Sequence, residues 1–484
     1  MSIASDLERP ATDLGGSRHS DEAGDAFGDH PRVGRPARKP RPLTEGAVRS
    51  AVSQFVSAGA GALTTLILAR ILGPAGTGRY AVTISLVIGL QTFATLSLQV
   101  SIGYFVGRGT WPPRQAFVTT QLAALGLGLT SVALALLIRA LFPSAFHNIS
   151  VGLVLVAAAG LPCALSWTFA AAVALAVDQY ELYAVPQALQ TTVGIVVILV
   201  LGAIYGVGGA LLGLTISHAV TAAVSFVWCR RALPPSDGRA TEPGQFRRAV
   251  AFALKSHVAN AVTFITYRLD IFILNGVTTA TEVGQYAIAV SVTQAVWLLP
   301  DALSSIVVPR LARVSWGHAA VDDDYQDLVE RKSVRHATIL ALVSALVLSL
   351  ALLVLVLVFL GSGFHESIEL GLILMPGSAM LAVASALASV MVGRGRPEIS
   401  MMVAFPVALL AIALYVFVIP SYGAVGAAVA SSVSYAIGFV LTVVIGSRRL
   451  GCRLLPLVIP TRSELDDYRR LAPWVLRLWP IRRV

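Results

Sequence analysis

The residues best suited to chemistry are polar side chains placed inside long apolar runs. Gln91, Thr95 and Gln99 are spaced four residues apart, so a continuous helix would carry them on one face. Amides and hydroxyls offer hydrogen bonds without the cost of a fixed charge, which suits the binding of sugar hydroxyl groups. Because polar groups at bilayer depth are costly and tend to face a cavity, we predict that this face lines one. The alternative is hydrogen bonding between packed helices.

A second polar stripe repeats this pattern later in the chain. It comprises Gln294, Trp297, Asp301 and Ser305. An offset of 206 residues places Thr95 on Asp301 and Gln99 on Ser305. The same wall is therefore polar in two parts of the chain, and we expect both parts to contribute to one substrate cavity.

The predicted span 249–275 adds charges to these stripes. One face carries Lys255, Thr263, Thr266 and Asp270. Lys255 and Asp301 lie at matching depths from the inner ends of their spans, which predicts an ion pair in the cytoplasmic third when no substrate is bound. A phosphate group would compete for the lysine as a charge partner.

Three further residues are candidates for a gate at the outer side. Arg70, at the outer end of the first span, is a candidate partner for Asp270 across the two halves. Arg268 projects away from Asp270 around the helix, and we expect it to extend toward the membrane interface.

The composition identifies the elements that position these residues. The sequence is 56% hydrophobic and 13% charged, whereas a globular chain is about a quarter charged. This excludes a soluble enzyme, a secreted disulfide scaffold and a nucleic-acid binder. Apolar runs of about 20 residues, each able to cross a bilayer, recur along the chain. They predict an all-α polytopic membrane protein with twelve spans, at 50–70, 80–106, 115–141, 150–177, 184–204, 207–228, 249–275, 284–309, 336–360, 368–393, 399–420 and 422–446.

Charge predicts the orientation. The short loops on one side hold fourteen Lys and Arg residues, whereas the other side holds only Arg70, Arg79 and Arg139. The positive-inside rule then places both chain ends in the cytoplasm of a multi-pass cytoplasmic (inner) membrane protein, with membrane lipids as partners.

An internal repeat divides the predicted spans into two halves. The stretch from Gly78 to Ser85 recurs from Gly284 to Ser291, and Tyr205-Gly206 recurs as Tyr422-Gly423 at an offset of 217. Six spans per half give parallel repeats, an architecture of transporters with a central cavity between two six-helix bundles. The predicted organisation is a disordered cytoplasmic tail at 1–44, bundles at 45–231 and 247–448, a cytoplasmic linker at 232–246 and a basic tail at 449–484.

No motif for a metal, a cofactor or catalysis is found in the sequence, so we predict a protein that is not an enzyme. In the C-terminal tail, Ser463 to Asp466 is similar to a capping box, and Leu471 to Leu478 has the pattern of a short amphipathic helix.

Several motifs resemble bacterial polysaccharide-biosynthesis flippases, which export O-antigen and related lipid-linked oligosaccharides. They are Leu68 to Gly78, Arg268-Leu269-Asp270, Leu298-Leu299-Pro300, Pro309-Arg310-Leu311 and Gly393 to Pro397. The resemblance covers roughly residues 45–448 and implies membership of the multidrug/oligosaccharidyl-lipid/polysaccharide exporter superfamily.

That resemblance implies a function by alternating access. The expected substrate is a polyprenyl-pyrophosphate-linked oligosaccharide that crosses the membrane for cell-surface polysaccharide synthesis. Glycan polymerase or glycosyltransferases are further candidate partners, and no nucleic acid is expected. The alternatives are a cation-coupled multidrug exporter of the same fold, which favours an acidic, aromatic pocket, and a membrane scaffold protein without transport.

Overall fold

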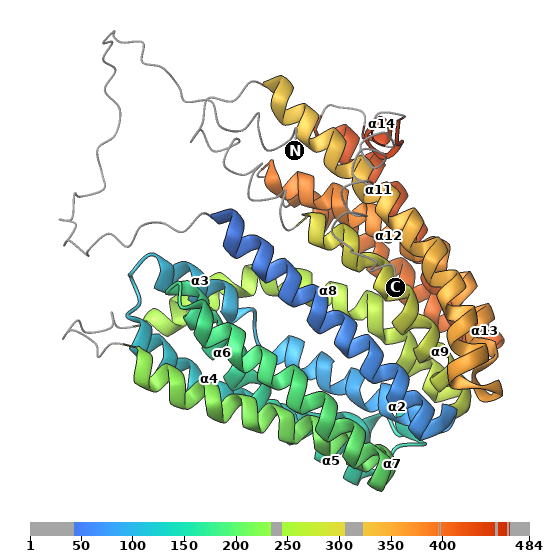
Figure 1. Ribbon diagram of the computed structural model, residues 1–484, viewed down its shortest axis with the longest axis horizontal. Helices are drawn as coiled ribbons and strands as arrows, with labels where there is room; N and C mark the ends of the chain where they lie inside the picture. Colours follow the sequence, from blue (N-terminus) through green and yellow to red (C-terminus); the bar gives the residue numbers. More distant parts are fainter. Residues whose placement is uncertain are drawn as a thin grey trace, which may run out of the picture. The chain divides into compact units, whose positions relative to one another are not determined.

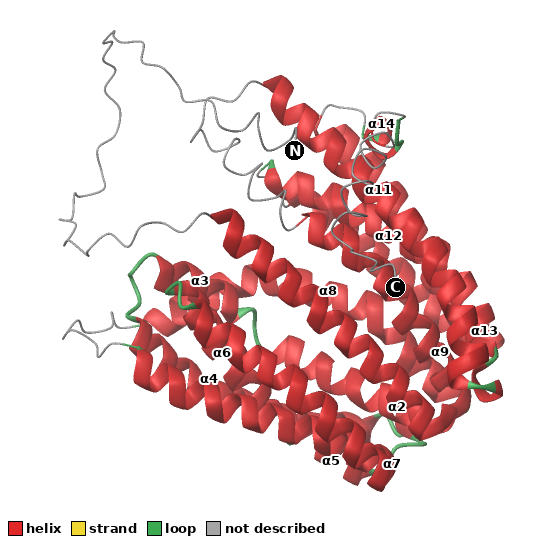
Figure 2. Cartoon of the chain, viewed as in Figure 1, coloured by secondary structure: helices red, strands yellow, loops and turns green. Residues whose placement is uncertain are grey.

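The computed structural model describes residues 43–233, 244–304, 323–394, 396, 398–450, 454–461 and 464. These residues are almost entirely helical and contain no strand (Figure 2). This is expected in lipid, where a helix satisfies its own backbone hydrogen bonds. The residues from Ala47 onward form one compact unit. The predicted N-terminal tail at 1–44 and the linker at 232–246 fall mostly outside the described residues, as does the amphipathic stripe at 471–478.

The helices of the first half follow one another with short connections. They are α2 (Leu43–Ala94), α3 (Leu98–Gly107), α4 (Pro113–Leu141), η1 (Ser144–Phe146), α5 (Val151–Ala158), α6 (Leu161–Ala176) and α7 (Tyr180–Ala232). Helices α4 to α7 contact one another and lie together in Figure 1.

The second half repeats this arrangement. Its helices are α8 (Gln245–Val277), α9 (Ala280–Gln294), η2 (Ala295–Trp297), α11 (Asp323–Val354), η3 (Leu355–Leu360), η4 (Ser362–Phe364), α12 (Glu366–Gly393), α13 (Glu398–Leu450) and α14 (Leu455–Val458). Helix α12 contacts α9, α11 and α13, whereas α8 contacts both α13 and α3 of the first half (Figure 1). The bundle boundaries proposed from the sequence are compatible with these contacts and stay a proposal.

Three very long helices each contain two spans. Gly73 in α2, Gly206 in α7 and Gly423 in α13 have positive φ values of 67°, 63° and 54°, and the chain leaves helical geometry there. In α7 the flanking segments pack antiparallel, with Gly209 against the Leu201 carbonyl. Eight segments of the described chain are long and apolar enough to cross a membrane. Three of them contain such a reversal, and α8 lies among them as a further long helix, so the all-α membrane fold is confirmed and the helices agree with about twelve spans.

The connections that join each odd-numbered span to the following even-numbered span lie at one end of the bundle. The Cβ positions of the glycines show this: Gly76 lies beside Val207, Gly363 beside Pro74 and Gly276 beside Ala145. In the same way, Gly423 lies beside Glu282. We call this the turn end; the spans alternate in direction from it, as the charge pattern predicts.

The internal repeat is visible in the backbone. Gly206 and Gly423, which are 217 residues apart, share their unusual conformation, with ψ values of −141° and −134°. At the offset of 206, a Cβ on Gly78 would lie 1.9 Å from the Ala280 carbonyl oxygen, and a Cβ on Gly284 would lie 1.9 Å from that of Pro74. Because Pro74 and Ala280 are also 206 residues apart, the two halves contact each other through a reciprocal, two-fold related pair.

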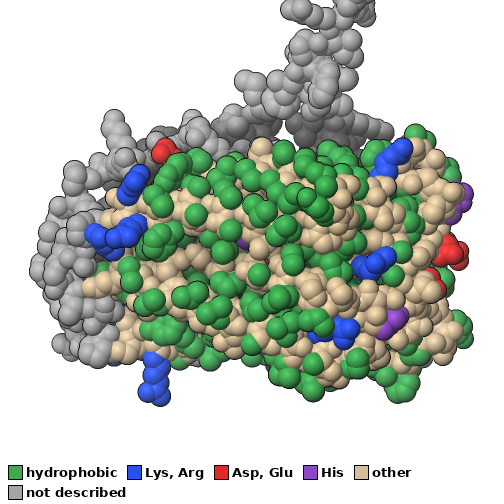
Figure 3. Space-filling view, turned by 90° about the horizontal axis from the view of Figure 1, so that it is seen from below, with side chains coloured by type: hydrophobic (Ala, Val, Ile, Leu, Met, Phe, Trp, Pro, Cys, Tyr) green, Lys and Arg blue, Asp and Glu red, His purple; other side chains and the backbone are tan. Residues whose placement is uncertain are grey.

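The outer surface of the helices is apolar. Large hydrophobic side chains such as Leu122, Val358 and Phe417 are 68%, 77% and 77% exposed. Green hydrophobic side chains are spread over the face in Figure 3, where charged side chains are sparse. Such a surface is suited to lipid rather than water.

A C-terminal segment packs against the end of the second half opposite the turn end. Leu454 and Leu457 join a buried cluster with Val334 of α11 and Met391 of α12. Glu464 accepts a hydrogen bond from Arg335 over 3.1 Å and another from the Thr461 backbone N–H over 2.7 Å. The Glu464 side chain thus reaches back to the Thr461 backbone as the acid of a capping box does, whereas the pattern predicted from Ser463 to Asp466 lies mostly outside the described residues. Close by, Arg394 forms a forked ion pair with the buried Glu330.

Candidate functional site

A cavity between the two halves is lined by two charged side chains, Arg268 and Asp270. It has a volume of about 190 Å³ and lies between α2 of the first half and α8 and α9 of the second. Arg268, Asp270 and Tyr286 line it from the second half, and Tyr80 lines it from the first. Tyr80 and Tyr286 are repeat equivalents, so the internal repeat places a tyrosine on each wall. We call this space the inter-half cavity.

Asp270 is held in a network of hydrogen bonds. It is 4% exposed and accepts hydrogen bonds from the Tyr286 hydroxyl and from the backbone N–H of Ile271, the latter over 2.8 Å. Ser431 Oγ of α13 lies 3.5 Å from Asp270 Oδ2 and 3.1 Å from the Tyr415 hydroxyl, which donates to the Thr266 carbonyl. A buried carboxyl needs such partners because an unsatisfied one is costly.

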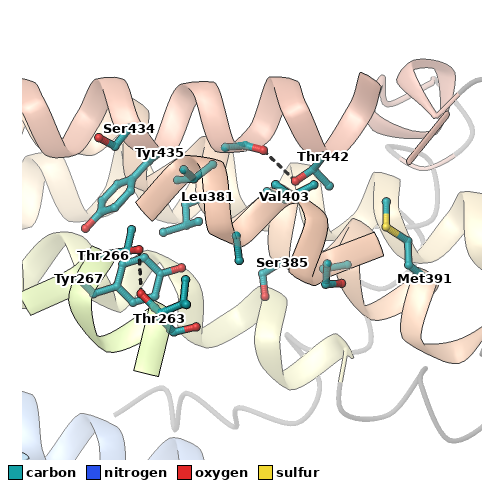
Figure 4. Close-up of a pocket in the computed structure, with 17 residues that line it drawn as sticks. Thr263, Thr266, Tyr267, Leu381, Ser385, Met391, Val403, Ser434, Tyr435 and Thr442 are labelled. Atoms are coloured by element: carbon teal, nitrogen blue, oxygen red, sulfur yellow. Dashed lines mark hydrogen bonds between the residues drawn. The ribbon is translucent and has the colours of Figure 1, made fainter. Parts of the chain in front are cut away.

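A second cavity lies inside the C-terminal half, and we call it the C-terminal pocket. Its volume is about 220 Å³, and seventeen residues of α8, α12 and α13 line it (Figure 4). Eight of the lining side chains bear hydroxyls: Thr263, Thr266, Tyr267, Ser385, Ser400, Ser434, Tyr435 and Thr442. The others are apolar or glycine, so the pocket combines apolar walls with spaced hydrogen-bonding groups.

Tyr267 lines both cavities and is the centre of an aromatic cluster. Its ring centroid lies 5.4 Å from that of Trp297 and 5.7 Å from that of Tyr435. The Trp297 indole N–H donates to the Ser378 carbonyl over 3.2 Å, which fixes the ring. Tyr267 is thus the aromatic side chain that the inter-half cavity and the C-terminal pocket share.

The stripe predicted in the first half does not form one continuous face. The helix is broken between Ala94 and Leu98, where Leu96 and Ser97 have positive φ values of 47° and 54°. The prediction that Gln91, Thr95 and Gln99 share a helix face is therefore wrong, because Gln99 belongs to α3. The Thr95 hydroxyl bonds to the Thr92 carbonyl, and Gln99 Oε1 is buried without a hydrogen-bond partner among the described residues.

Several of the site residues predicted in the second half lie in or beside the C-terminal pocket, unlike those of the first half. Thr263 and Thr266 line the C-terminal pocket, and Trp297 packs on two of its tyrosines. Asp301 is exposed and accepts a hydrogen bond from Ser385, a pocket residue, over 3.2 Å. Gln294 ends α9 and is half-buried, whereas Ser305 lies outside the described residues.

The predicted charge pairs are not found in the described part of the chain. Arg70 donates to the Phe359 carbonyl and stacks over its ring, while Asp270 has the partners given above, so the two do not form a latch. Arg268 lines the inter-half cavity, and its predicted place at the membrane interface stays a prediction. The side chain of Lys255 lies outside the described residues, and its pairing with Asp301 stays a prediction.

Sequence reasoning missed the tyrosines and the partners of the helix break. Tyr267, Tyr286, Tyr415 and Tyr435 occur inside predicted spans, and intramembrane hydroxyls that need partners were the available signal. Asn260 of α8 donates to Ser97 Oγ over 2.9 Å, and His257 Nδ1 lies 3.4 Å from it. Among the described residues, no group of three or more His, Cys, Asp or Glu side chains is placed to hold a metal ion.

A family model described as "Polysaccharide biosynthesis protein" matches residues 43–315, which is more than half of the chain. The chain belongs to this family. A comparison with curated protein sequences finds no match. The match to the polysaccharide biosynthesis family is therefore the sequence evidence for what this chain is related to.

Solved structures share the fold of this family member at low sequence identity. The lipid II flippase MurJ in an inward closed conformation has a TM-score of 0.67 at 13% identity, covering 89% of this chain and 93% of MurJ. An inward-facing multidrug resistance MATE transporter of the MOP superfamily has a TM-score of 0.64 at 15% identity, covering 82% and 94%. Its outward-facing counterpart has a TM-score of 0.61 at 14% identity, covering 84% and 96%. These similarities establish the transporter fold.

Proposed function

We propose that this protein is a flippase that moves a polyprenyl-diphosphate-linked oligosaccharide across the bacterial cytoplasmic membrane by alternating access. The observation that carries the proposal is membership of the polysaccharide biosynthesis family in a chain with twelve spans and the MOP transporter fold. A glycan cannot cross hydrocarbon unaided, because each unsatisfied polar group costs several kcal/mol.

The inter-half cavity supports this proposal. It lies where two repeats meet, the usual place of substrate sites in such transporters. Arg268 offers a bidentate donor to a phosphate group, and its neighbour Asp270 is already occupied by Tyr286 and Ile271. The head group would pass between the halves while the polyprenyl chain stays in lipid. The substrate-cavity residues named from the sequence, including Lys255 and Gln91, belong to this proposal.

The second candidate is a cation-coupled multidrug exporter, and one observation favours it. Asp301 lies close to an aromatic cluster, a combination that binds organic cations. Asp301 is directed to Ser385, however, and is not among the residues that line a cavity.

The deciding experiment is reconstitution of the purified full-length protein in liposomes with a fluorescent polyprenyl-diphosphate oligosaccharide in both leaflets. A flippase makes the inner-leaflet pool accessible to a membrane-impermeant quencher within minutes, and protein-free liposomes do not. If the pool stays protected while the same vesicles take up a cationic dye against a proton or sodium gradient, the exporter is the correct assignment.

A further inference from the structure

Three hydroxyls of the C-terminal pocket, those of Tyr267, Ser400 and Tyr435, have no hydrogen-bond partner among the described residues. Tyr435 is 5% exposed, its ring packs on Tyr267 and Trp297, and its hydroxyl makes no hydrogen bond to the described chain. Ser400 Oγ is also unpartnered, but it is closed off from the cavity, so the tyrosine hydroxyls are the ones that an occupant can reach. A tyrosine hydroxyl inside a protein is ordinarily satisfied, so the unpartnered hydroxyls of Tyr267 and Tyr435 around one cavity indicate a polar occupant.

The other hydroxyls of the pocket determine what that occupant must offer. Thr266, Ser434 and Thr442 each donate their proton to a carbonyl one turn earlier in their own helix, over 2.9, 2.7 and 2.8 Å. Their oxygens retain lone pairs and can only accept further hydrogen bonds. Ser434 is 0% exposed, so Thr266 and Thr442 are the acceptors that an occupant reaches, and the occupant must carry donors for them.

The charge and the volume of the C-terminal pocket limit which ligands it can hold. None of the seventeen lining side chains is charged, which disfavours a diphosphate and, because Asp301 is not among them, an organic cation. Leu381, Val403 and Val407 supply apolar surface to the same pocket. A volume of about 220 Å³ corresponds to about seven waters at ~30 Å³ each, enough for one sugar ring but not for an oligosaccharide.

We propose that the C-terminal pocket binds a single uncharged sugar ring of the transported saccharide, apart from the passage of the diphosphate through the inter-half cavity. This inference rests on the proposed function. Ring hydroxyls donate to Thr266 and Thr442, and the apolar face of the ring packs on Tyr267 and Tyr435. The pocket lies within one half, so this site selects the saccharide while that half moves as a unit.

The test uses the full-length protein in lipid nanodiscs and tritiated methyl glycosides of neutral hexoses and 6-deoxyhexoses. Thr442→Val removes one acceptor while keeping the shape of the side chain, and we expect binding of the preferred glycoside to fall about fivefold, as for one lost hydrogen bond. Thr221→Val is the matched control, because Thr221 is equally buried and donates to Ser217 one turn earlier in α7. Ala388→Leu, which fills the pocket, is a second variant expected to abolish binding.

The outcomes separate this inference from the proposed function. Glycoside binding that is weakened by Thr442→Val and unchanged by Thr221→Val supports the site, whether or not lipid flipping is observed. Flipping by a wild-type protein that binds no glycoside overturns the site and leaves the flippase standing. Saturable binding of tetraphenylphosphonium that Ala388→Leu removes, without glycoside binding, overturns the site in favour of an organic cation.

Discussion

Gly78 and Gly284 lie backbone to backbone across the two halves of the protein. The Cβ position of Gly78 is 2.9 Å from the backbone nitrogen of Gly284, and that of Gly284 is 3.0 Å from the nitrogen of Gly78. No side chain larger than hydrogen fits either position without moving one half away from the other. The contact lies near the turn end, where an alternating-access transporter must separate its halves once in every cycle.

Gly78→Ala and Gly284→Ala are expected to destabilise this packed arrangement to the same extent. Overpacking of this kind costs about 1–3 kcal/mol, and the reciprocal geometry predicts equal effects. Melting temperatures of the purified variants measure it. Because both glycines belong to one contact, the double variant should lose less than the sum of the single losses.

Gly126→Ala is the control for these substitutions. Gly126 is in α4 and has open space at its Cβ position, so alanine there should be neutral or slightly stabilising. Equal losses at positions 78 and 126 would show that the inter-half contact is not what these substitutions disturb.

Tyr286→Phe removes a hydroxyl that donates to Asp270 and is expected to lower the stability of the folded protein by about 1–3 kcal/mol. Tyr80→Phe is the matched control, because Tyr80 is the repeat equivalent and lines the same cavity without a hydrogen bond to another described residue. Thermal unfolding in detergent compares the two. A Tyr80→Phe loss as large as that of Tyr286→Phe would contradict a specific role of the Asp270 network.

The docked C-terminal segment should respond to pH through Glu464. Burial raises the pKa of this carboxyl, but hydrogen bonds from Thr461 and Arg335 outweigh it and lower the pKa from 4.5 to about 2. A lowered folded pKa means that the stabilisation is complete above pH 4.5 and is lost as the pH falls through about 2.

A spin label at position 459 can follow this change, since Ile459 is 57% exposed. Its mobility is expected to rise between pH 4.5 and pH 2 in the wild-type background. Glu464→Gln should give a mobile label at every pH in that range, and a pH response that survives this substitution would assign the transition to another group.

Reporter fusions test the orientation. A periplasmic phosphatase fused after Tyr205, at the turn end, is expected to be active, and one fused after Leu233 inactive. Arg230 and Arg231 are exposed at the end of α7 and supply the cytoplasmic charge. The reverse pattern of activity would invert the protein in the membrane and with it the direction of transport.

The sequence was sufficient to predict the twelve spans and the repeat, because both depend on apolar length and on glycine-containing turns. Tyr205-Gly206 and Tyr422-Gly423 mark reversals that need a positive φ, which glycine supplies without strain. These signals are local, so they can be read without knowing the partners of each helix.

The candidate site was predicted only in part, because it depends on packing between distant helices. Leu96 and Ser97 interrupt the second span although neither residue type favours positive φ, and Asn260 from α8 supplies the hydrogen bond to Ser97 there. No local pattern reveals such a break, and the polar stripe was therefore extended across it. In the same way, Tyr435 reaches the C-terminal pocket only through the packing of α13 on α8.

The single-residue reversals at Gly73, Gly206 and Gly423 have a consequence outside transport. On the proposed orientation they face the periplasm, and each joins two spans through a single non-helical residue rather than through a loop. Proteases on that side of the membrane therefore meet few extended peptide segments at these three connections.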